Sequence, residues 1–201
     1  MPAAREALLD AALSALSTLP WATVRMVDVA SAAGVSRQTL YNEFGSKDGL
    51  ARALVRRAAD GYLAGVEQAL ESPGGTGDRL AATAAWTVRA ARTNTLVRAL
   101  LTGCWGERLP RPARLSGPPS SPVPAQRRAD AGPPTPAELL GLVRDRAVAA
   151  LDGGRPPHDP ALAVTCEIAL RLALSYAVAA SSVATDAAPL VRDVVERWPA
   201  G

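Results

Sequence analysis

Two short apolar segments separated by a glycine lie within residues 27–50, and this pattern constrains the fold more than any other part of the chain. In the first segment Val29, Ala30 and Ala33 recur at the spacing of a helix that buries one face. Gly34 follows directly, and glycine is the residue best suited to the left-handed conformation that ends many helices. The sequence therefore predicts a helix that stops at Gly34, with a tight turn after it.

A second helix is expected to begin just after Ser36. The Ser36 hydroxyl can accept a hydrogen bond from a free N–H group in the first helical turn, which makes serine a good N-cap. Leu40 and Phe44 can share a core with the alanine-rich first helix. The residues at the helix start or on its other side are Arg37, Gln38, Thr39, Tyr41 and Asn42. Two short helices joined by a glycine-containing turn form a helix-turn-helix, whose second helix enters the major groove of DNA.

The composition and the helical spacing elsewhere predict an all-α protein. Of the 201 residues 48% are hydrophobic but only 4% are aromatic, and alanine and leucine are abundant while β-branched residues are sparse. We expect an N-terminal three-helix domain over residues 1–50 and a larger helical domain over residues 51–201. Further helices are predicted over residues 4–19, 47–70, 78–93, 96–101 with Asn94 as its cap, 137–151, 160–182 and 187–198.

Residues 106–136 contain nine prolines and few apolar residues. This segment is too rich in proline for a helix and too polar for a core, so we expect a mobile, disordered loop. Five arginines against Glu107 and Asp130 give the loop the whole net charge of +3, so the global charge does not by itself indicate nucleic acid. Two interpretations of this loop remain: an insertion without a function, and a lid over a ligand site.

The sequence lacks the motifs of enzymes and metal sites. His158 is the only histidine, and Cys104 and Cys166 lie far apart with no partner at metal-ligand spacing, so we expect neither a zinc site nor a cofactor. There is no serine nucleophile elbow and no glycine-rich phosphate loop, so an enzyme is not expected. Both cysteines are interpreted as buried thiols in a reducing cytoplasm.

No segment of the sequence predicts export or a membrane span. Glu6 and Asp10 interrupt the apolar residues near the N-terminus, so a signal peptide is not expected. The most apolar stretch, residues 168–180, contains Arg171 and is shorter than the roughly 18–20 residues that cross a bilayer. We therefore expect a soluble, cytoplasmic protein.

The larger domain contains candidates for binding a ligand and a partner. Large apolar side chains with single polar groups suit a pocket for a small apolar or amphipathic molecule, although such side chains are more often plain core. These are Tyr62, Trp86, Leu100, Cys104, Trp105 and Tyr176. The helix over residues 160–182 is apolar nearly all round, which indicates burial in its own domain or against a second copy. For Arg171, an ion pair with Glu167, within the helix or between subunits, is favoured over an anionic ligand.

The motif residues resemble those of the tetracycline-repressor (TetR) family of bacterial transcription regulators. The matching blocks, all within residues 4–54, are Asp28-Val29-Ala30, Ala33-Gly34-Val35-Ser36, Thr39-Leu40-Tyr41, Phe44 and Ser46-Lys47. The rest of the chain matches only in helical content and length. The resemblance implies a homodimer that binds a palindromic double-stranded DNA operator, as a repressor released by a small-molecule effector. The alternatives are an activator or a helical interaction protein without a small-molecule response.

The resemblance also implies roles for individual residues. The base-contacting residues would be Ser36, Arg37, Gln38, Thr39 and Asn42, and the phosphate-contacting residues would be Arg25, Tyr41 and Lys47. The chemistry agrees, because arginine bonds guanine and glutamine bonds adenine through two atoms each, worth ~1–3 kcal/mol of discrimination. Lys47, the chain's single lysine, stands at the positive N-terminus of its helix, which suits a phosphate.

A four-helix bundle of the last two long helices from each subunit would make the dimer. Its interface residues would be Glu167, Arg171, Leu174, Val178, Leu190 and Val194.

Two features depart from the family pattern. Arg25 stands three residues before Asp28, where the family usually has a threonine or serine cap, so the capping box is lost and Arg25 becomes a candidate phosphate contact. The N-terminal arm contains only one basic residue, Arg5. With few phosphate contacts, we expect a shallow salt dependence of DNA binding.

Overall fold

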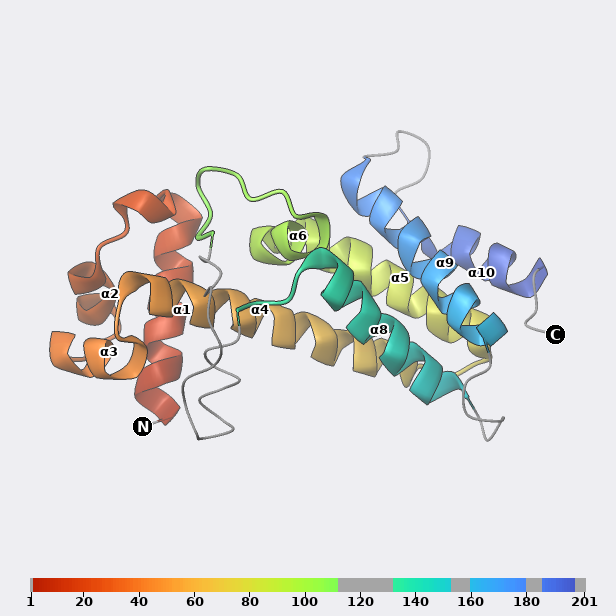
Figure 1. The fold of residues 1–201 in the computed structure, drawn as a ribbon, viewed down its shortest axis with the longest axis horizontal. Coiled ribbons are helices and arrows are strands. Elements are labelled where there is room, and N and C mark those ends of the chain that lie inside the picture. Colours follow the sequence, from red (N-terminus) through yellow and green to blue (C-terminus); the bar gives the residue numbers. More distant parts are fainter. Residues whose placement is uncertain (1, 112–131, 153–159, 180–185, 198–201) are drawn as a thin grey trace. The chain divides into compact units, whose positions relative to one another are not determined.

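The computed structural model describes residues 2–111, 132–152, 160–179 and 186–197, and over this range every regular element is a helix (Figure 1). The expected all-α class is confirmed. The chain forms two compact units, Met1–Ala58 with Trp105–Pro133, and Ala59–Cys104 with Pro134–Gly201. The residues of the predicted N-terminal domain all fall in the first unit. Most of the loop predicted over 106–136, from 112 to 131, lies outside the described residues.

The first unit packs three short helices around a leucine core. Leu8, Leu40 and Leu50 are completely buried, and α1 packs against both α2 and α3. This is the predicted helix-turn-helix domain. Its elements are α1 (Pro2–Thr18), the 3-10 turn η1 (Trp21–Thr23), α2 (Met26–Ala32), α3 (Arg37–Phe44) and the beginning of α4 (Lys47–Leu70).

Two glycines set the corners of this domain. Gly34 has a φ of +67° after α2, and Gly45 has a φ of +70° after α3. Both angles lie in the region that side chains with a Cβ rarely adopt, so glycine lets each helix end and the chain turn without strain. The predicted stop at Gly34 is confirmed.

The second unit is organised around α5. Figure 1 shows α8 and α9 side by side, and α5 packs against both α9 and α10. Two threonines of α5, Thr83 and Thr87, are buried, and each donates its hydroxyl to the carbonyl four residues earlier. The elements are the rest of α4, α5 (Thr76–Thr93), α6 (Thr95–Thr102), α8 (Pro136–Leu151), α9 (Pro160–Val178) and α10 (Ala188–Arg197).

Local capping explains several helix starts in this unit. The Asn94 side chain accepts hydrogen bonds from the N–H groups of Leu96 at 3.0 Å and Val97 at 3.3 Å, which confirms the predicted cap. Thr135 and Glu138 form a capping box at the start of α8.

One expectation about the cysteines is wrong. Cys166 is buried as predicted, but Cys104 is exposed. Gly103, with a φ of +73°, ends α6 immediately before it, so Cys104 falls beyond the apolar face of that helix.

The apolar stretch of α9 is longer than the one over residues 168–180 that the sequence analysis identified. Helix α9 has 19 residues, and an 18-residue window within it has a mean hydropathy of 1.6, so the helix is long and apolar enough to cross a membrane by length and composition alone. A core helix passes the same test, and α9 packs against α5, α8 and α10 within its unit.

Candidate nucleic-acid interface

The start of α3 is fixed by Ser36. Its Oγ accepts a hydrogen bond from the Thr39 N–H at 3.0 Å and lies 2.9 Å from the Thr39 hydroxyl oxygen. The backbone of Ser36 is extended and Arg37 is the first helical residue, which confirms the predicted N-cap. This contact holds the first turn of α3, where the predicted base-contacting residues begin.

The two faces of α3 differ in burial as predicted. Leu40 is completely buried and Phe44 is 8% exposed, so they anchor the helix in the core of the first unit. Arg37, Gln38 and Asn42 are exposed, and Thr39 is half-buried. Tyr41 is 44% exposed, so its ring is not part of the core. The helix therefore presents a polar, solvent-facing surface.

Gln38 and Asn42 form a pair on this surface. The Gln38 Nε2 donates to the Asn42 Oδ1 at 2.8 Å, one helical turn away. The amide groups keep the Gln38 Oε1 acceptor, one Gln38 N–H and both Asn42 N–H donors for other partners. A glutamine that bonds adenine needs one acceptor and one donor, and both remain.

Lys47 contacts the turn before α2. Its Nζ donates to the Ala22 carbonyl at 3.0 Å and lies 5.5 Å from the centroid of the Trp21 ring. The ammonium has three donors, so one is occupied within the protein and two remain. Lys47 is thus a structural residue of this domain, whatever else it contacts.

Arg5 holds the other end of α3, a role that the sequence did not indicate. Its Nη1 donates to the Glu43 carbonyl at 3.4 Å and lies 3.6 Å from the Glu43 carboxylate. The guanidinium carbon is 4.7 Å from the centroid of the Phe44 ring. A positive charge at a helix C-terminus is favourable. Arg5 and Glu43 are 38 positions apart in the sequence, so no local pattern predicts this contact.

Arg25 begins α2 without capping it. It is exposed, and its side chain makes no cap hydrogen bond to the helix. The predicted loss of the capping box is confirmed. Asp28 lies in the first turn, where its negative charge interacts favourably with the positive end of the helix dipole.

The segment after α6 also reaches this domain. The Trp21 N–H donates to the Arg108 carbonyl at 2.9 Å, and the Arg108 Nη2 donates to the Thr18 carbonyl at 3.1 Å. Trp21 is 8% exposed. Arg108 thereby supports the turn that Lys47 contacts, another arrangement that the sequence did not indicate.

The residues predicted to line a ligand pocket have different environments. In the second unit Tyr62 is buried, with its hydroxyl 3.0 Å from that of Thr87, and the Trp86 Nε1 donates to the Tyr62 carbonyl at 3.0 Å. Leu100 is 1% exposed. The other three are Cys104, which is exposed, and Trp105 and Tyr176, which are half-buried; Trp105 belongs to the first unit. The structure brings Tyr62 and Trp86 together.

An open groove lies elsewhere, between α1 and α2 of the first unit. Asp10, Arg25 and Asp28 are among its lining residues, and none of the predicted pocket residues is. Within the described part of the chain, no three histidine, cysteine or acidic side chains gather as metal ligands would.

The residues predicted for a dimer interface lie on α9 and α10. Arg171 donates two hydrogen bonds to the Glu167 Oε1, at 2.7 and 3.0 Å, so the intrahelical ion pair that was one of the predicted alternatives is present. Val178 is 59% exposed and Leu190 40%. Leu174 and Val194 are half-buried.

The helix-turn-helix segment matches a known family. The model of bacterial regulatory proteins of the tetR family matches residues 8–54. The HTH-type transcriptional regulator AlkX of Mycobacterium tuberculosis (strain ATCC 25618 / H37Rv) is 46% identical over 68 residues, which are 34% of this chain and 32% of that protein. The match thus spans about a third of the relative's length.

Solved structures share the fold of nearly the whole chain. The TetR family repressor AlkX from Dietzia sp. strain DQ12-45-1b, implicated in biodegradation of n-alkanes, has a TM-score of 0.55 at 20% identity, covering 96% of this chain and 94% of that one. FadR from Bacillus subtilis, in complex with stearoyl-CoA, has a TM-score of 0.53 at 14% identity, covering 95% of each chain. The N-terminal domain, over residues 8–54, therefore matches the TetR family of bacterial regulatory proteins.

Proposed function

We propose that the chain is a transcriptional regulator that binds a palindromic DNA operator as a homodimer and, as a repressor, releases it when a small molecule binds. One observation carries the proposal. The exposed start of α3 is held rigid by the Ser36 cap and by the buried Leu40 and Phe44, within a domain that matches known regulators. A rigid helix with a polar N-terminal face is what insertion into a major groove requires.

The proposed base contacts come from this face. Arg37 would bond guanine and Gln38 would bond adenine, and the other proposed base-contacting residues are Ser36, Thr39 and Asn42. The proposed phosphate contacts are Arg25, Tyr41 and Lys47. Each sits on or beside the helix-turn-helix, so the phosphate contacts would fix the register in which the bases are read.

The ligand response would involve the second unit, with Tyr62 and Trp86 near the binding site. Large apolar surfaces with few polar groups suit a small apolar or amphipathic effector. Coupling between ligand and operator is reciprocal, so an effector that weakens DNA binding must itself bind less tightly in the presence of DNA. Such a regulator would work in the cytoplasm, where bacterial DNA lies, and would need no cofactor.

The test begins with selection of bound sequences from random DNA by the purified protein. The best site is then used to measure the affinity of Arg37→Ala, for which we expect a loss of about 1–3 kcal/mol and weaker discrimination at one base position. Arg98→Ala is the matched control, because Arg98 is exposed on α6 in the other unit. If the combined variant Arg37→Ala, Tyr41→Phe and Lys47→Ala binds DNA as the wild type does, the proposal fails.

A helical interaction protein without DNA binding would select no sequence over random DNA. Transcription from a reporter that carries the selected site separates a repressor from an activator. Compounds that release the site in a screen would identify the effector, and an effector whose binding is unaffected by operator DNA would contradict the proposed coupling.

A further inference from the structure

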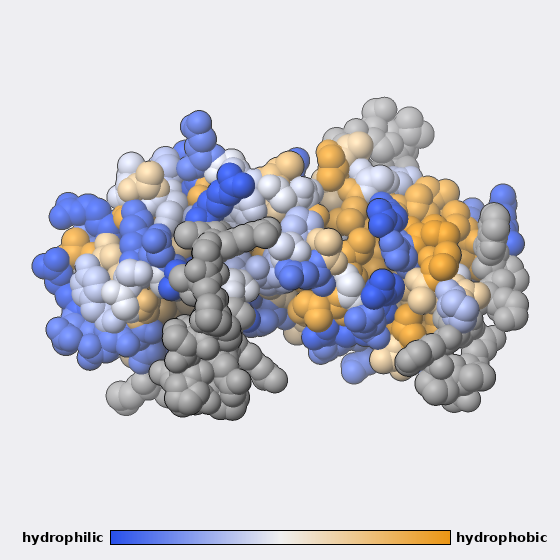
Figure 2. All heavy atoms as spheres, in the orientation of Figure 1, coloured by the Kyte–Doolittle hydropathy of each residue, from blue (hydrophilic) through white to orange (hydrophobic). Residues whose placement is uncertain are grey.

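The exposed face of α3 carries two amide side chains that bond to each other. Gln38 and Asn42 are both exposed, and the side of the first unit seen in Figure 2 is mostly hydrophilic. They stand four positions apart, so their side chains lie on one face of the helix. The Gln38 Nε2 donates to the Asn42 Oδ1 at 2.8 Å. The pair therefore belongs to the surface that, under the proposed function, enters the major groove.

The direction of this bond decides which groups of Gln38 face outward. An amide has one acceptor oxygen and two N–H donors. Asn42 takes one donor of Gln38, so the Oε1 acceptor and a single N–H stay available for DNA. If the glutamine amide turned over, its oxygen would face the Asn42 oxygen across the 2.8 Å contact. While Asn42 presents Oδ1, Gln38 is therefore held in one of its two amide orientations.

A fixed orientation restricts the bases that Gln38 accepts. Adenine presents the N7 acceptor and the N6–H donor in the major groove, and these match the N–H and the Oε1 of the held amide. Cytosine offers only the N4–H donor, so it makes one bond where adenine makes two. Guanine O6 and thymine O4 are acceptors, which an oxygen held toward them repels. A freely turning amide would swing an N–H toward these oxygens and lose the discrimination.

The bond between the two amides is strengthened where it is needed. In water a hydrogen bond between two exposed side chains on a helix contributes little to stability. Insertion into a groove removes much of the water around both side chains. A lower local dielectric strengthens the bond, and breaking it then leaves an amide without a partner. The orientation of Gln38 is therefore held most firmly when the helix is on DNA.

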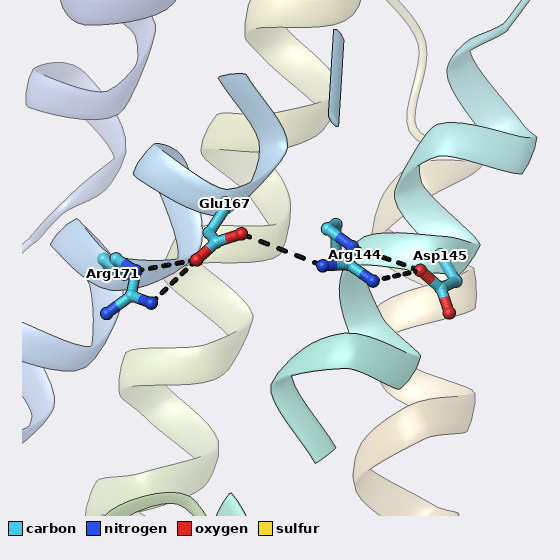
Figure 3. Close-up of polar contacts among 4 residues, drawn as sticks. All are labelled: Arg144, Asp145, Glu167 and Arg171. Carbon is cyan, nitrogen blue, oxygen red and sulfur yellow. Dashed lines mark hydrogen bonds and ion pairs between the residues drawn. The ribbon is translucent and has the colours of Figure 1, made fainter. Parts of the chain in front are cut away.

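The pair is neutral, which suits a position beside DNA. Figure 3 shows the same four-residue spacing in the Arg171–Glu167 pair of α9, whose side chains carry opposite charges. A carboxylate in such a pair on α3 would face the phosphates and repel them. Asn42 supplies the same kind of acceptor oxygen without the charge. The amide pair thus positions a base-reading side chain without weakening the attraction to DNA.

We propose that Asn42 is a positioning residue that holds the Gln38 amide in the orientation that reads adenine. Asn42 acts through Gln38, whatever its own N–H groups contact. The base pair that Gln38 reads is A·T, with the adenine toward Gln38. This inference rests on the proposed DNA-binding function and adds to it the identity of one base in each half-site and the residue that makes the choice selective.

The experiment measures the affinity of the full chain for the selected operator with each of the four bases at one position. That position is the one at which Gln38→Ala removes the base preference. The wild type is expected to prefer adenine there by roughly ten-fold or more. Asn42→Leu keeps the branched shape and raises helix propensity but has no acceptor, so the preference should fall to about two-fold or less.

The variant Asn42→Asp separates positioning from base contact. A carboxylate keeps an acceptor for the Gln38 N–H and loses both N–H donors of Asn42. A positioning residue predicts that this variant keeps the preference for adenine, while its affinity for every sequence falls because of the added negative charge. A residue that only contacts a base of its own predicts the opposite pattern. Both variants would then leave the adenine preference intact and lose a preference at another base pair.

Gln68→Leu on α4 is the matched control, because Gln68 is exposed and the same kind of change is made away from α3. The readout is a ratio of affinities for two bases, which a loss of stability alone does not change. A wild type that prefers a base other than adenine at this position, or an Asn42→Leu variant that keeps the full preference, would overturn the inference and leave the proposed function standing. A wild type that selects no sequence would refute both.

Discussion

Lys47 and the carbonyl of Ala22 are joined by a hydrogen bond of 3.0 Å, which ties the first residue of α4 to the turn before α2. The same ammonium lies over the Trp21 ring, and the Trp21 N–H is bonded to Arg108. The single lysine of the chain therefore joins α4 to this turn, and Trp21 of the turn joins the segment after α6. Its two remaining donors are available to a phosphate, so one side chain could hold the domain together and contact DNA.

The variant Lys47→Met separates these two roles. Removal of the internal contacts should lower the free energy of unfolding by about 1 kcal/mol. Removal of one phosphate contact should reduce operator affinity. The slope of log affinity against log salt concentration is negative, and its magnitude should fall by about one. Chemical unfolding and binding at several salt concentrations measure the two effects. A lower stability with an unchanged salt slope would make Lys47 purely structural.

Arg5 should support α3 without contacting DNA. Arg5→Gln removes the charge from the helix C-terminus and from the Phe44 ring, so we expect a loss of about 1 kcal/mol in unfolding free energy. Operator affinity should fall because α3 is held less firmly, while the salt slope stays the same. Arg5→Lys keeps the charge and should recover part of the stability. A reduced slope with unchanged stability would instead identify Arg5 as a phosphate contact.

Arg25 offers a substitution that should stabilise the fold. Arg25 occupies the N-cap position of α2 without a side-chain hydrogen bond to the helix, so Arg25→Thr supplies the missing cap and should add about 0.5–1 kcal/mol to the unfolding free energy. The same variant should weaken operator binding if Arg25 holds a phosphate. Arg25→Ala loses the charge without gaining a cap, so it separates the effects. Equal stability of the threonine and alanine variants would contradict the capping argument.

The features that the sequence predicted correctly depend on residues close together in the chain. Gly34 ends α2, Ser36 caps α3 and Asn94 caps α6 through groups at most four positions away. Interactions between residues this close together can be predicted from the sequence alone. The alternation of buried Leu40 and Phe44 with exposed Arg37 and Tyr41 follows from helical periodicity in the same way.

The features that it missed depend on distant residues. The Lys47 to Ala22 bond spans 25 positions and the Arg108 to Thr18 bond spans 90. Nothing in the neighbourhood of either residue indicates such a partner, because the fold brings them together. The same holds for α8, because which of its residues are exposed depends on how its other face packs against distant helices.

Two buried weak acids of the second unit, Tyr62 and Cys166, should make its stability depend on pH. Burial raises the pKa of Tyr62 from 10.0 to about 12, opposed in part by the hydrogen bond with Thr87, and burial raises the pKa of Cys166 from 9.0 to about 12. Both pKa values are higher in the folded state than in the unfolded state. Ionisation of either group therefore destabilises the fold, and the neutral forms are the ones compatible with it. Their contribution is complete below about pH 9 and is lost as pH rises toward 12.

Each pKa unit corresponds to 1.36 kcal/mol, so the loss is roughly 2–4 kcal/mol for each residue. Urea unfolding from pH 7 to 11.5 should therefore show a constant stability up to about pH 9 and a steep fall above it. Cys166→Ala should reduce the fall from pH 9 upward, and Tyr62→Phe should reduce it only above pH 10, although each costs some stability at neutral pH. If the unfolding free energy of the double variant falls above pH 9 as steeply as that of the wild type, ionisation of these two groups is not the cause of the fall.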